Sequence, residues 1–356
     1  MASKLRLSVL DQSPVSGGST PAEALQRSIE LARHVDELGY HRLWYSEHHA
    51  MDTLACTAPE VFLARVGVET KRIRIGSGGI MLPHYTPLKV AEVFRTLEAL
   101  YPGRVDLGVG RAPGGGPVES HALRRIRSTP APDDFPQQLG ELLAFLHPEL
   151  ELFPDDHPFR RIRVAPAPAE SQVNRPDLWL LGSSMWSAVT AAANGLPYSF
   201  AHFFASNSGS TTRSAIEHYQ QNFQPSAFRS APESTIAIGA IVAETQHEAE
   251  FLHASVRLLQ RRIRTDDRRP IATPEDALRE LAGPAASGFG FSLSEPDGGE
   301  FPRYVVGTPD HVRAELTHVA EELNLDELII NTITHSHEAR LRSYTLLAEA
   351  FELGKD

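Results

Sequence analysis

Residues 46–49 read Ser-Glu-His-His and place one carboxylate and two histidines side by side. Histidine changes its charge near neutral pH, so Glu47, His48 and His49 are candidates for acid or base groups in a catalysed reaction. The same side chains could instead bind a metal ion, but neighbours in sequence rarely converge on one ion and no third ligand is evident. We therefore predict no metal site. A polar surface loop without chemistry is the remaining alternative for this stretch.

A glycine-rich stretch at residues 76–79 is followed by three apolar residues, 80–82. Gly78 and Gly79 have no side chains, which lets a flat ligand approach the backbone closely. Ile80 could then form a wall against one face of an aromatic ring. A glycine-rich turn that binds nothing fits the same stretch, so a ligand here depends on groups elsewhere in the chain.

Residues 108–116 are rich in glycine and superficially resemble a dinucleotide-binding fingerprint. The third glycine is missing at the required spacing, and Pro113 followed by three glycines cannot open a helix, so we reject a Rossmann site. Arg111 lies in this loop directly after a predicted strand, where it is well placed to meet an anion. An ordinary surface arginine is the alternative.

Ser183, Ser184 and Ser187 lie at the start of a helix predicted for residues 186–194. The N-terminus of a helix presents free N–H groups and the positive end of the helix dipole. Serines at such a position either cap the helix or bind a phosphate group. Arg111 follows the neighbouring predicted strand, so a cation and a helix terminus converge, which favours the phosphate.

Short apolar runs alternate along the chain with longer amphipathic segments, a pattern typical of repeated strand–helix units. Strands are predicted at residues 5–10, 42–46, 73–77, 105–109, 178–181, 198–201, 235–243 and 327–331. Helices are predicted at residues 21–38, 59–69, 88–100, 137–146, 186–194, 211–223, 248–264, 310–323 and 336–353. Eight units can close into a (β/α)8 TIM barrel, and this count favours the barrel over a doubly wound open sheet. Active sites of such barrels lie where the strands end, and the candidate groups all follow predicted strands.

Three irregular stretches interrupt this regularity, at approximately residues 110–135, 152–176 and 265–304. The first is predicted to include a short helix at 122–127, and the second could contain a hairpin. Long loops within compact domains are often functional. We interpret all three as insertions into a single domain that spans residues 1–356.

The composition excludes several classes of protein. The chain has 356 residues, and 34 basic against 45 acidic side chains give a net charge of −11, which is unsuited to binding nucleic acid or an anionic membrane. Cys56 is the single cysteine, so no intramolecular disulfide is possible, and it is expected to be a small buried hydrophobe. No apolar stretch is long enough to span a membrane, and the first ten residues lack a signal peptide, so a cytoplasmic location is expected.

Taken together, these motifs resemble those of the luciferase-like monooxygenase family. The matching stretches are residues 43–49, 75–83, 103–111, 181–184, 195–197 and 306–309, together with the first predicted strand. Each stretch is short, but their order and spacing are specific and extend over nearly the whole chain. The resemblance is closest to single-chain homologues of the luciferase α subunit.

The resemblance implies a luciferase-like barrel that binds reduced FMN at the carboxyl ends of its strands. His48 matches the family's catalytic histidine, with Glu47 and His49 beside it. Arg111, Ser184 and Ser187 match phosphate ligands, and Ser183 could add a contact. The segment from Gly78 through Gly79 to Ile80 matches the part beneath the flavin ring, where the family often has a non-prolyl cis peptide bond. Bacterial luciferase has a reactive cysteine where this chain has Gly110, which puts light emission in doubt.

The resemblance further implies a monooxygenase that uses O2 and reduced FMN to oxygenate a small organic substrate, with the reduced flavin supplied by a separate reductase. It also implies a homodimer, often formed through the second and third helices. Three alternatives stay open: an F420-dependent hydride-transfer oxidoreductase, a non-catalytic flavin-binding protein and, lastly, a metal-dependent barrel hydrolase.

Overall fold

The computed structural model describes residues 5–124, 133–166, 175–204, 212–265, 267–283 and 301–355. Its strands are β1 (Arg6–Asp11), β2 (Arg42–Tyr45), β3 (Arg74–Met81), β4 (Val105–Gly110), β5 (Asp177–Gly182), β6 (Tyr198–Ala201), β7 (Ser234–Val242), β8 (Tyr304–Gly307) and β9 (Glu327–Asn331). Its α-helices are α1 (Pro21–Leu38), α2 (Pro59–Glu69), α3 (Pro87–Leu100), α4 (Pro117–Leu123), α5 (Phe135–Leu146), α6 (Met185–Asn194), α7 (Thr212–Asn222), α8 (Gln246–Arg264), α9 (Pro274–Leu281), α10 (Pro309–Glu322) and α11 (His337–Ala350).

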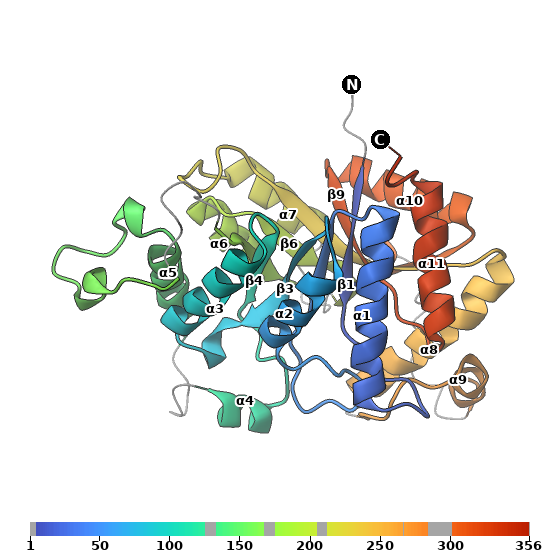
Figure 1. Cartoon of the computed structure of the whole chain (residues 1–356). Coiled ribbons are helices and arrows are strands. Elements are labelled where there is room, and N and C mark those ends of the chain that lie inside the picture. Colours follow the sequence, from blue (N-terminus) through green and yellow to red (C-terminus); the bar gives the residue numbers. More distant parts are fainter. Residues whose placement is uncertain are drawn as a thin grey trace.

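The strands form a closed parallel barrel with helices around it (Figure 1). Strands β1 to β6 pair in chain order, β6 pairs with β7, and β9 closes the ring between β7 and β1. The predicted (β/α)8 barrel is therefore confirmed. Because every strand runs in the same direction, the loops that follow the strands gather at one end of the barrel, the lower edge of Figure 1 where α4 and α9 lie.

Strand β8 was not predicted from the sequence. It pairs with the second half of β7, from Gly239 to Val242, whereas β6 pairs only with the first half of β7. The barrel strand predicted as the eighth is consequently β9. Only four residues long, β8 begins at Tyr304, the last residue of the predicted insertion at 265–304, and extends the sheet beside the closed ring. Within the insertion itself, the structure adds α9.

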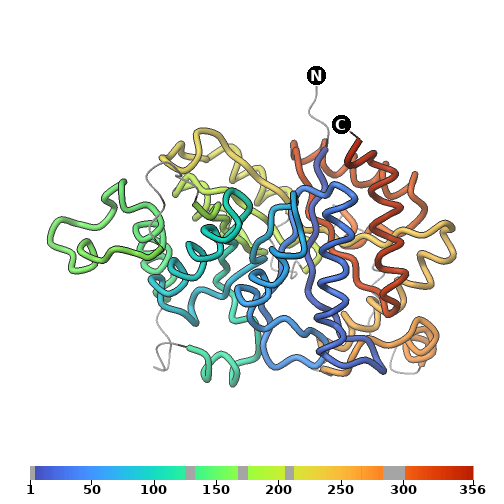
Figure 2. The backbone as a smooth tube through the Cα atoms, viewed as in Figure 1, coloured from blue at the N-terminus to red at the C-terminus, as the bar shows by residue number. Residues whose placement is uncertain are grey.

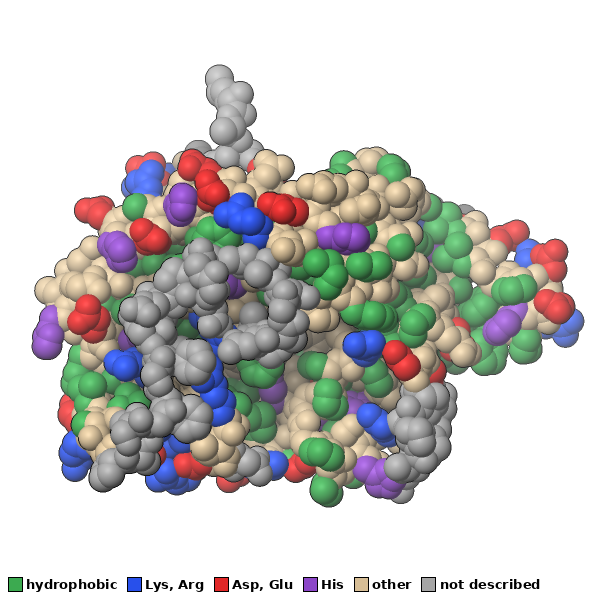
Figure 3. All heavy atoms as spheres, turned by 180° about the vertical axis from the view of Figure 1, so that it is seen from behind, with side chains coloured by type: hydrophobic (Ala, Val, Ile, Leu, Met, Phe, Trp, Pro, Cys, Tyr) green, Lys and Arg blue, Asp and Glu red, His purple; other side chains and the backbone are tan. Residues whose placement is uncertain are grey.

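Two other predictions for the insertions differ from the structure. The predicted helix at 122–127 is replaced by α4, which begins earlier because Pro117 occupies its first turn, and residues 125–127 lie outside the described residues. Residues 152–166, the described first part of the predicted hairpin, contain the 3-10 turn η3 (Pro158–Arg161) and no strand. This segment stands out from the body of the molecule (Figure 3).

Local sequence signals place α1 as expected. Thr20 and Glu23 form a reciprocal capping box at its start, and Pro21 occupies the first helical position. Gly39 ends the helix at a φ of 87°, a left-handed conformation that glycine adopts without steric cost. The chain therefore turns at Gly39, from the end of α1 toward the start of β2.

Ionic side chains fill the amino end of the barrel. The guanidinium of Arg42 donates to Asp106 Oδ2 at 2.9 Å and to Glu327 Oε1 at 2.7 Å, which joins β2, β4 and β9. All three side chains are almost fully buried. Burial alone would lower the pKa of Arg42, but the two carboxylates hold that pKa above its ordinary value. This end of the barrel is therefore occupied by a layer of buried, paired charges.

An aromatic layer lies next to the charged one, on its side toward the carboxyl ends of the strands. The rings of Trp44 and Trp179 meet edge to face with centroids 5.4 Å apart, and they pack with Leu10, Ala237 and Ile329 in the barrel interior. The indole N–H of Trp44 donates to Asp106 Oδ2 at 2.9 Å, which connects the aromatic layer to the charged layer. With the amino end and the middle filled, only the carboxyl end of the barrel remains available for a site.

We predict that Arg42→Met destabilises the protein by about 3–5 kcal/mol, because it leaves two buried carboxylates without their cation. Urea unfolding measures the change in the free energy of unfolding. Arg33→Met is the control, since Arg33 is half exposed and pairs with Glu69 at the surface, where loss of an ion pair changes stability little. Equal stability of the two variants would contradict a structural role for the charged layer.

Candidate active site at the carboxyl ends of the strands

The loops that follow β2, β3 and β4 are joined by hydrogen bonds at the carboxyl end of the barrel. The backbone N–H of His49 donates to Gly114 O at 2.8 Å, and the backbone N–H of Met81 donates to the Glu47 carboxylate at 2.9 Å. The tube in Figure 2 shows the chain after β2 and the chain leading into α4 at this same end. The structure thus brings together groups that lie more than sixty residues apart in sequence.

Glu47 is completely buried, and both of its oxygens are engaged. Oε1 accepts the hydroxyl of Tyr85 at 2.8 Å and lies 2.7 Å from His49 Nε2, while Oε2 accepts the N–H of Met81. A carboxylate surrounded by donors in this way is held in one orientation. Tyr85 and Met81 were not predicted as site residues, since no sequence pattern distinguishes them from core residues.

His48 is held differently from its neighbours. Its Nδ1 lies 3.0 Å from the Ser46 hydroxyl, and its backbone N–H donates to Cys56 O at 3.1 Å. Among the described residues, no hydrogen bond involves its Nε2. Burial lowers the pKa of His48 to about 4, so its imidazole is neutral at neutral pH and able to accept a proton. Cys56 itself is buried, as predicted, and burial raises its pKa.

The end of β3 departs from regular sheet geometry. The peptide bond between Gly78 and Gly79 is cis, as the resemblance implies, and the pairing with β4 shifts register between Ser77 and Ile80. A Cβ added at Gly78 would lie 2.8 Å from a methyl carbon of Leu10, so the protein itself occupies the space next to this glycine. Glycine is therefore required here by packing inside the barrel.

Gly110, at the end of β4, has open space beside it. A Cβ added at this position would meet only the sulfur of Met81, at 3.9 Å. The neighbouring loop is tighter, since a Cβ at Gly114 would lie 3.1 Å from both Glu47 O and Met81 Cγ. An open position bordered by Met81 and Arg111 is suited to a flat ligand that approaches the strand end closely.

Arg111 lies next to the start of α6, as predicted for a phosphate site. Its guanidinium lies 4.1 Å from the ring centroid of Trp186, in the first turn of that helix, and 3.2 Å from Asp133 Oδ2. Ser184 is the N-cap residue, but its side chain makes no capping hydrogen bond. The first N–H groups of α6 and a half-exposed cation thus face the same region, which is the arrangement that binds anions.

The three candidate serines differ in availability. Ser183 and Ser184 are both partly exposed at the end of β5. Ser187 is buried, donates its hydroxyl to Ser184 O at 2.8 Å and lies 3.1 Å from the hydroxyl of Tyr198. A phosphate bound here would therefore be held mainly by Arg111, Ser183, Ser184 and the backbone, with Ser187 supporting the turn.

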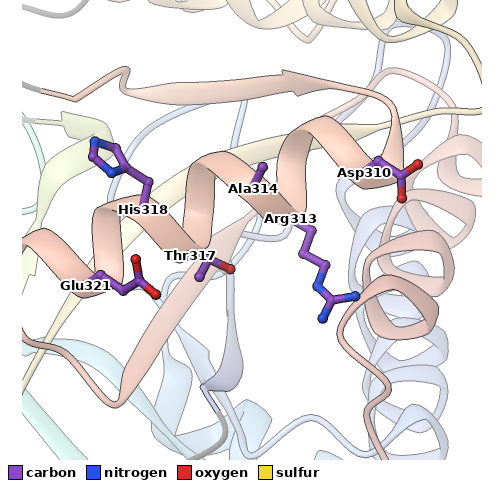
Figure 4. Close-up of a pocket in the computed structure, with 6 residues that line it drawn as sticks. All are labelled: Asp310, Arg313, Ala314, Thr317, His318 and Glu321. Atoms are coloured by element: carbon purple, nitrogen blue, oxygen red, sulfur yellow. The ribbon is translucent and has the colours of Figure 1, made fainter. Parts of the chain in front are cut away.

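The hollow on α10 does not compete with this region. A surface hollow on α10 is lined by Asp310, Arg313, Ala314, Thr317, His318 and Glu321 (Figure 4). All six residues come from one helix, and their polar groups point in different directions, so they form no convergent site.

In the part of the chain that the structure describes, no group of three or more His, Cys, Asp or Glu side chains is arranged to hold a metal ion. No described helix combines the length and apolarity that crossing a membrane requires.

Comparison with known proteins identifies the family to which this barrel belongs. The family model described as luciferase-like monooxygenase matches residues 5–327, so the chain belongs to the luciferase-like monooxygenase family. The chain is 35% identical to the luciferase-like monooxygenase of Escherichia coli strain K12 over 349 residues, covering 98% of this chain and 97% of that protein. It is 34% identical to the N-acetyl-S-alkylcysteine monooxygenase of Bacillus subtilis, covering 97% and 98% of the two chains.

Solved structures agree with this assignment. The crystal structure of apo-MsnO8 has a TM-score of 0.86 and 43% sequence identity, covering 98% of both chains. Two more distant structures share the fold alone. The FMN complex of the oxygenating constituent of 3,6-diketocamphane monooxygenase from Pseudomonas putida has a TM-score of 0.68 at 16% identity, and an F420-dependent secondary alcohol dehydrogenase has 0.56 at 14%.

We predict that Arg111→Gln weakens the binding of FMN by roughly tenfold or more, because one charge-assisted hydrogen bond to phosphate is lost. Binding of riboflavin, which has no phosphate, is expected to stay within twofold. Fluorescence titration measures both affinities. Arg160→Gln, on the protruding segment, removes the same charge far from α6 and serves as the control. An equal loss for FMN and riboflavin would contradict the phosphate role of Arg111.

Proposed function

We propose that the protein is a flavin-dependent monooxygenase that uses reduced FMN and O2 to oxygenate a small organic substrate, with the reduced flavin supplied by a separate reductase. The observation that carries this proposal is that His48, whose pKa burial lowers to about 4, lies at the same barrel end as Arg111 and the start of α6. Membership of a family whose relatives are monooxygenases supports the oxygenation reaction.

The described residues fit a flavin mononucleotide. Arg111, Ser183, Ser184 and the first N–H groups of α6 would hold the phosphate, with Ser187 bracing the turn. The segment from Gly78 through Gly79 to Ile80 would lie beneath the flavin ring, and the open position at Gly110 leaves room beside it. When bound, reduced FMN supplies the electrons that activate O2, and the protein contributes orientation, exclusion of water and proton management.

His48 is the residue that we assign to proton transfer. Its Nε2 accepts or returns a proton at the reacting atoms, and the contact between its Nδ1 and Ser46 fixes the ring orientation. Glu47 and His49, the other two candidates in this stretch, support His48 by holding the surrounding loops. The low pKa that burial imposes on His48 keeps this base unprotonated across the neutral range.

An F420-dependent hydride-transfer enzyme is the second candidate, because an F420-dependent alcohol dehydrogenase shares the fold. The arrangement of Arg111 and α6 binds a phosphate in either cofactor. A non-catalytic flavin-binding protein is the third candidate, and the enclosed Glu47, His48 and His49 argue against it. Titration of the purified protein with FMN and with F420 distinguishes the first two.

A homodimer formed through α2 and α3 is part of the proposal. Val61 and Val68 on α2 are 69% and 73% exposed, and Leu100 at the end of α3 is 58% exposed. Large apolar side chains exposed on adjacent helices favour association through that face. Light scattering of the purified protein measures its mass against 39.1 kDa for one chain.

We expect rapid mixing of the anaerobic protein–FMNH2 complex with oxygenated buffer to produce a long-lived absorbing species distinct from oxidised FMN. Stopped-flow absorbance measures its lifetime. Immediate formation of oxidised FMN, at the rate seen without protein, would argue against oxygen activation and make F420 the next cofactor to test.

We predict that His48→Ala lowers turnover by roughly 10²–10⁴-fold and leaves flavin affinity within twofold. Because the pKa of His48 is lowered to about 4, wild-type turnover should keep its value as pH falls through 6.5 and decline only as pH approaches 4. His247→Ala, on the exposed face of α8, is the control. Equal loss of turnover and flavin binding in His48→Ala would contradict the assigned role.

A further inference from the structure

The Glu47 carboxylate connects the loop after β2 to the end of β3 and to the segment that follows β3. It accepts from Tyr85 and Met81 and contacts His49, and its own backbone lies within the loop after β2. Among the described residues, every polar contact of this carboxylate is internal to the protein. A group with both oxygens engaged and no exposed surface is poorly placed to exchange protons with a substrate.

The contacts continue from Glu47 toward the cofactor region. The side chain of Met81 lies against the positions of Gly110 and Gly114, and its backbone N–H donates to Glu47. Met81 therefore links Glu47 to the end of β4 and to the loop after it. His49 donates its backbone N–H to Gly114, and His84 Nε2 lies 2.7 Å from Pro113 O. The loop that contains Arg111 is therefore anchored by His49, which contacts Glu47, and by His84, the neighbour of Tyr85 in the chain.

Tyr85 stabilises the charge on Glu47. Burial, and after it the charge of Glu47, raises the pKa of Tyr85 well above its ordinary value, so its hydroxyl remains a donor at any physiological pH. Glu60, at the start of α2, lies close enough that the charge of Glu47 adds to the effect of burial in raising the pKa of Glu60. A nearby second carboxyl group makes the donors around Glu47 more important for keeping it in position.

We propose that Glu47 and Tyr85 form a positioning clamp: Tyr85 fixes the Glu47 carboxylate, which holds Met81 and His49 and thereby the β4 loop that seats the flavin. Both are positioning residues, since neither is assigned contact with the reacting atoms. The part of this inference that concerns flavin rests on the function proposed above, whereas the connection to Met81 does not.

Two variants separate the clamp from general packing. Tyr85→Phe keeps the ring and removes only the hydroxyl. Glu47→Gln keeps the side-chain shape but replaces one acceptor oxygen by an NH2 group. The remaining oxygen cannot keep the contacts with Tyr85 and His49 and also accept the hydrogen bond from Met81. Tyr40→Phe is the matched control, because the buried Tyr40 hydroxyl donates to Tyr344 O at 2.8 Å and makes no contact with this cluster.

The experiment observes Met81 directly in the protein without flavin. The chain has four methionines, so ¹³C-methyl labelling gives four signals, and Met81→Leu identifies the one from Met81. In Tyr85→Phe and Glu47→Gln we expect the Met81 signal to move or broaden, and FMN affinity to fall by roughly tenfold. In Tyr40→Phe all four signals and the affinity should stay at the wild-type values.

The outcomes are distinct. An unchanged Met81 signal in both clamp variants overturns the proposal, as does a displaced signal with wild-type FMN affinity, which would limit the cluster to packing. If the wild-type protein binds no flavin, the function proposed above fails, while a displaced Met81 signal in the two variants still supports the clamp.

Discussion

The buried ion pairs of Arg42 determine which end of the barrel can hold a site. A guanidinium shared between Asp106 and Glu327 joins strands that are distant in the chain, and its charges can stay buried only because the partners are in contact. The Trp44 indole donates to Asp106 and packs against Trp179, which extends this layer toward the carboxyl ends of the strands. Together these side chains fill the barrel from its amino end, so ligand binding is restricted to the carboxyl end.

At that open end, the Glu47 carboxylate and the backbone of His49 connect the loops by hydrogen bonds. Glu47 holds the end of β3, and His49 holds the loop after β4, so His48 lies between two fixed segments. Burial in this surrounding keeps the imidazole of His48 neutral. The division of roles follows from exposure and contacts: His48 has a ring nitrogen available for chemistry, whereas Glu47 is fully occupied with the protein itself.

Much of the fold and part of the site could be predicted from the sequence. Apolar periodicity located all eight barrel strands, and the helix predicted at residues 21–38 coincides with α1. β8 was missed because four residues carry too little periodicity to separate a strand from a loop. The clamp residues Tyr85 and Met81 were missed for another reason: their role depends on a partner more than thirty positions away, which local spacing does not reveal.

The sequence by itself determined the strand–helix alternation, the family, and the placement of Glu47, His48, Arg111 and the serines after strands, because periodicity and local motifs are properties of neighbouring residues. Only the tertiary structure decided which of these groups touch. It set Arg111 against Trp186 at the start of α6, engaged the hydroxyl of Ser187 within its own turn, and enclosed Glu47 among three donors. Burial and long-range contacts arise when distant strands pair, and they assign different roles to side chains that look alike in sequence.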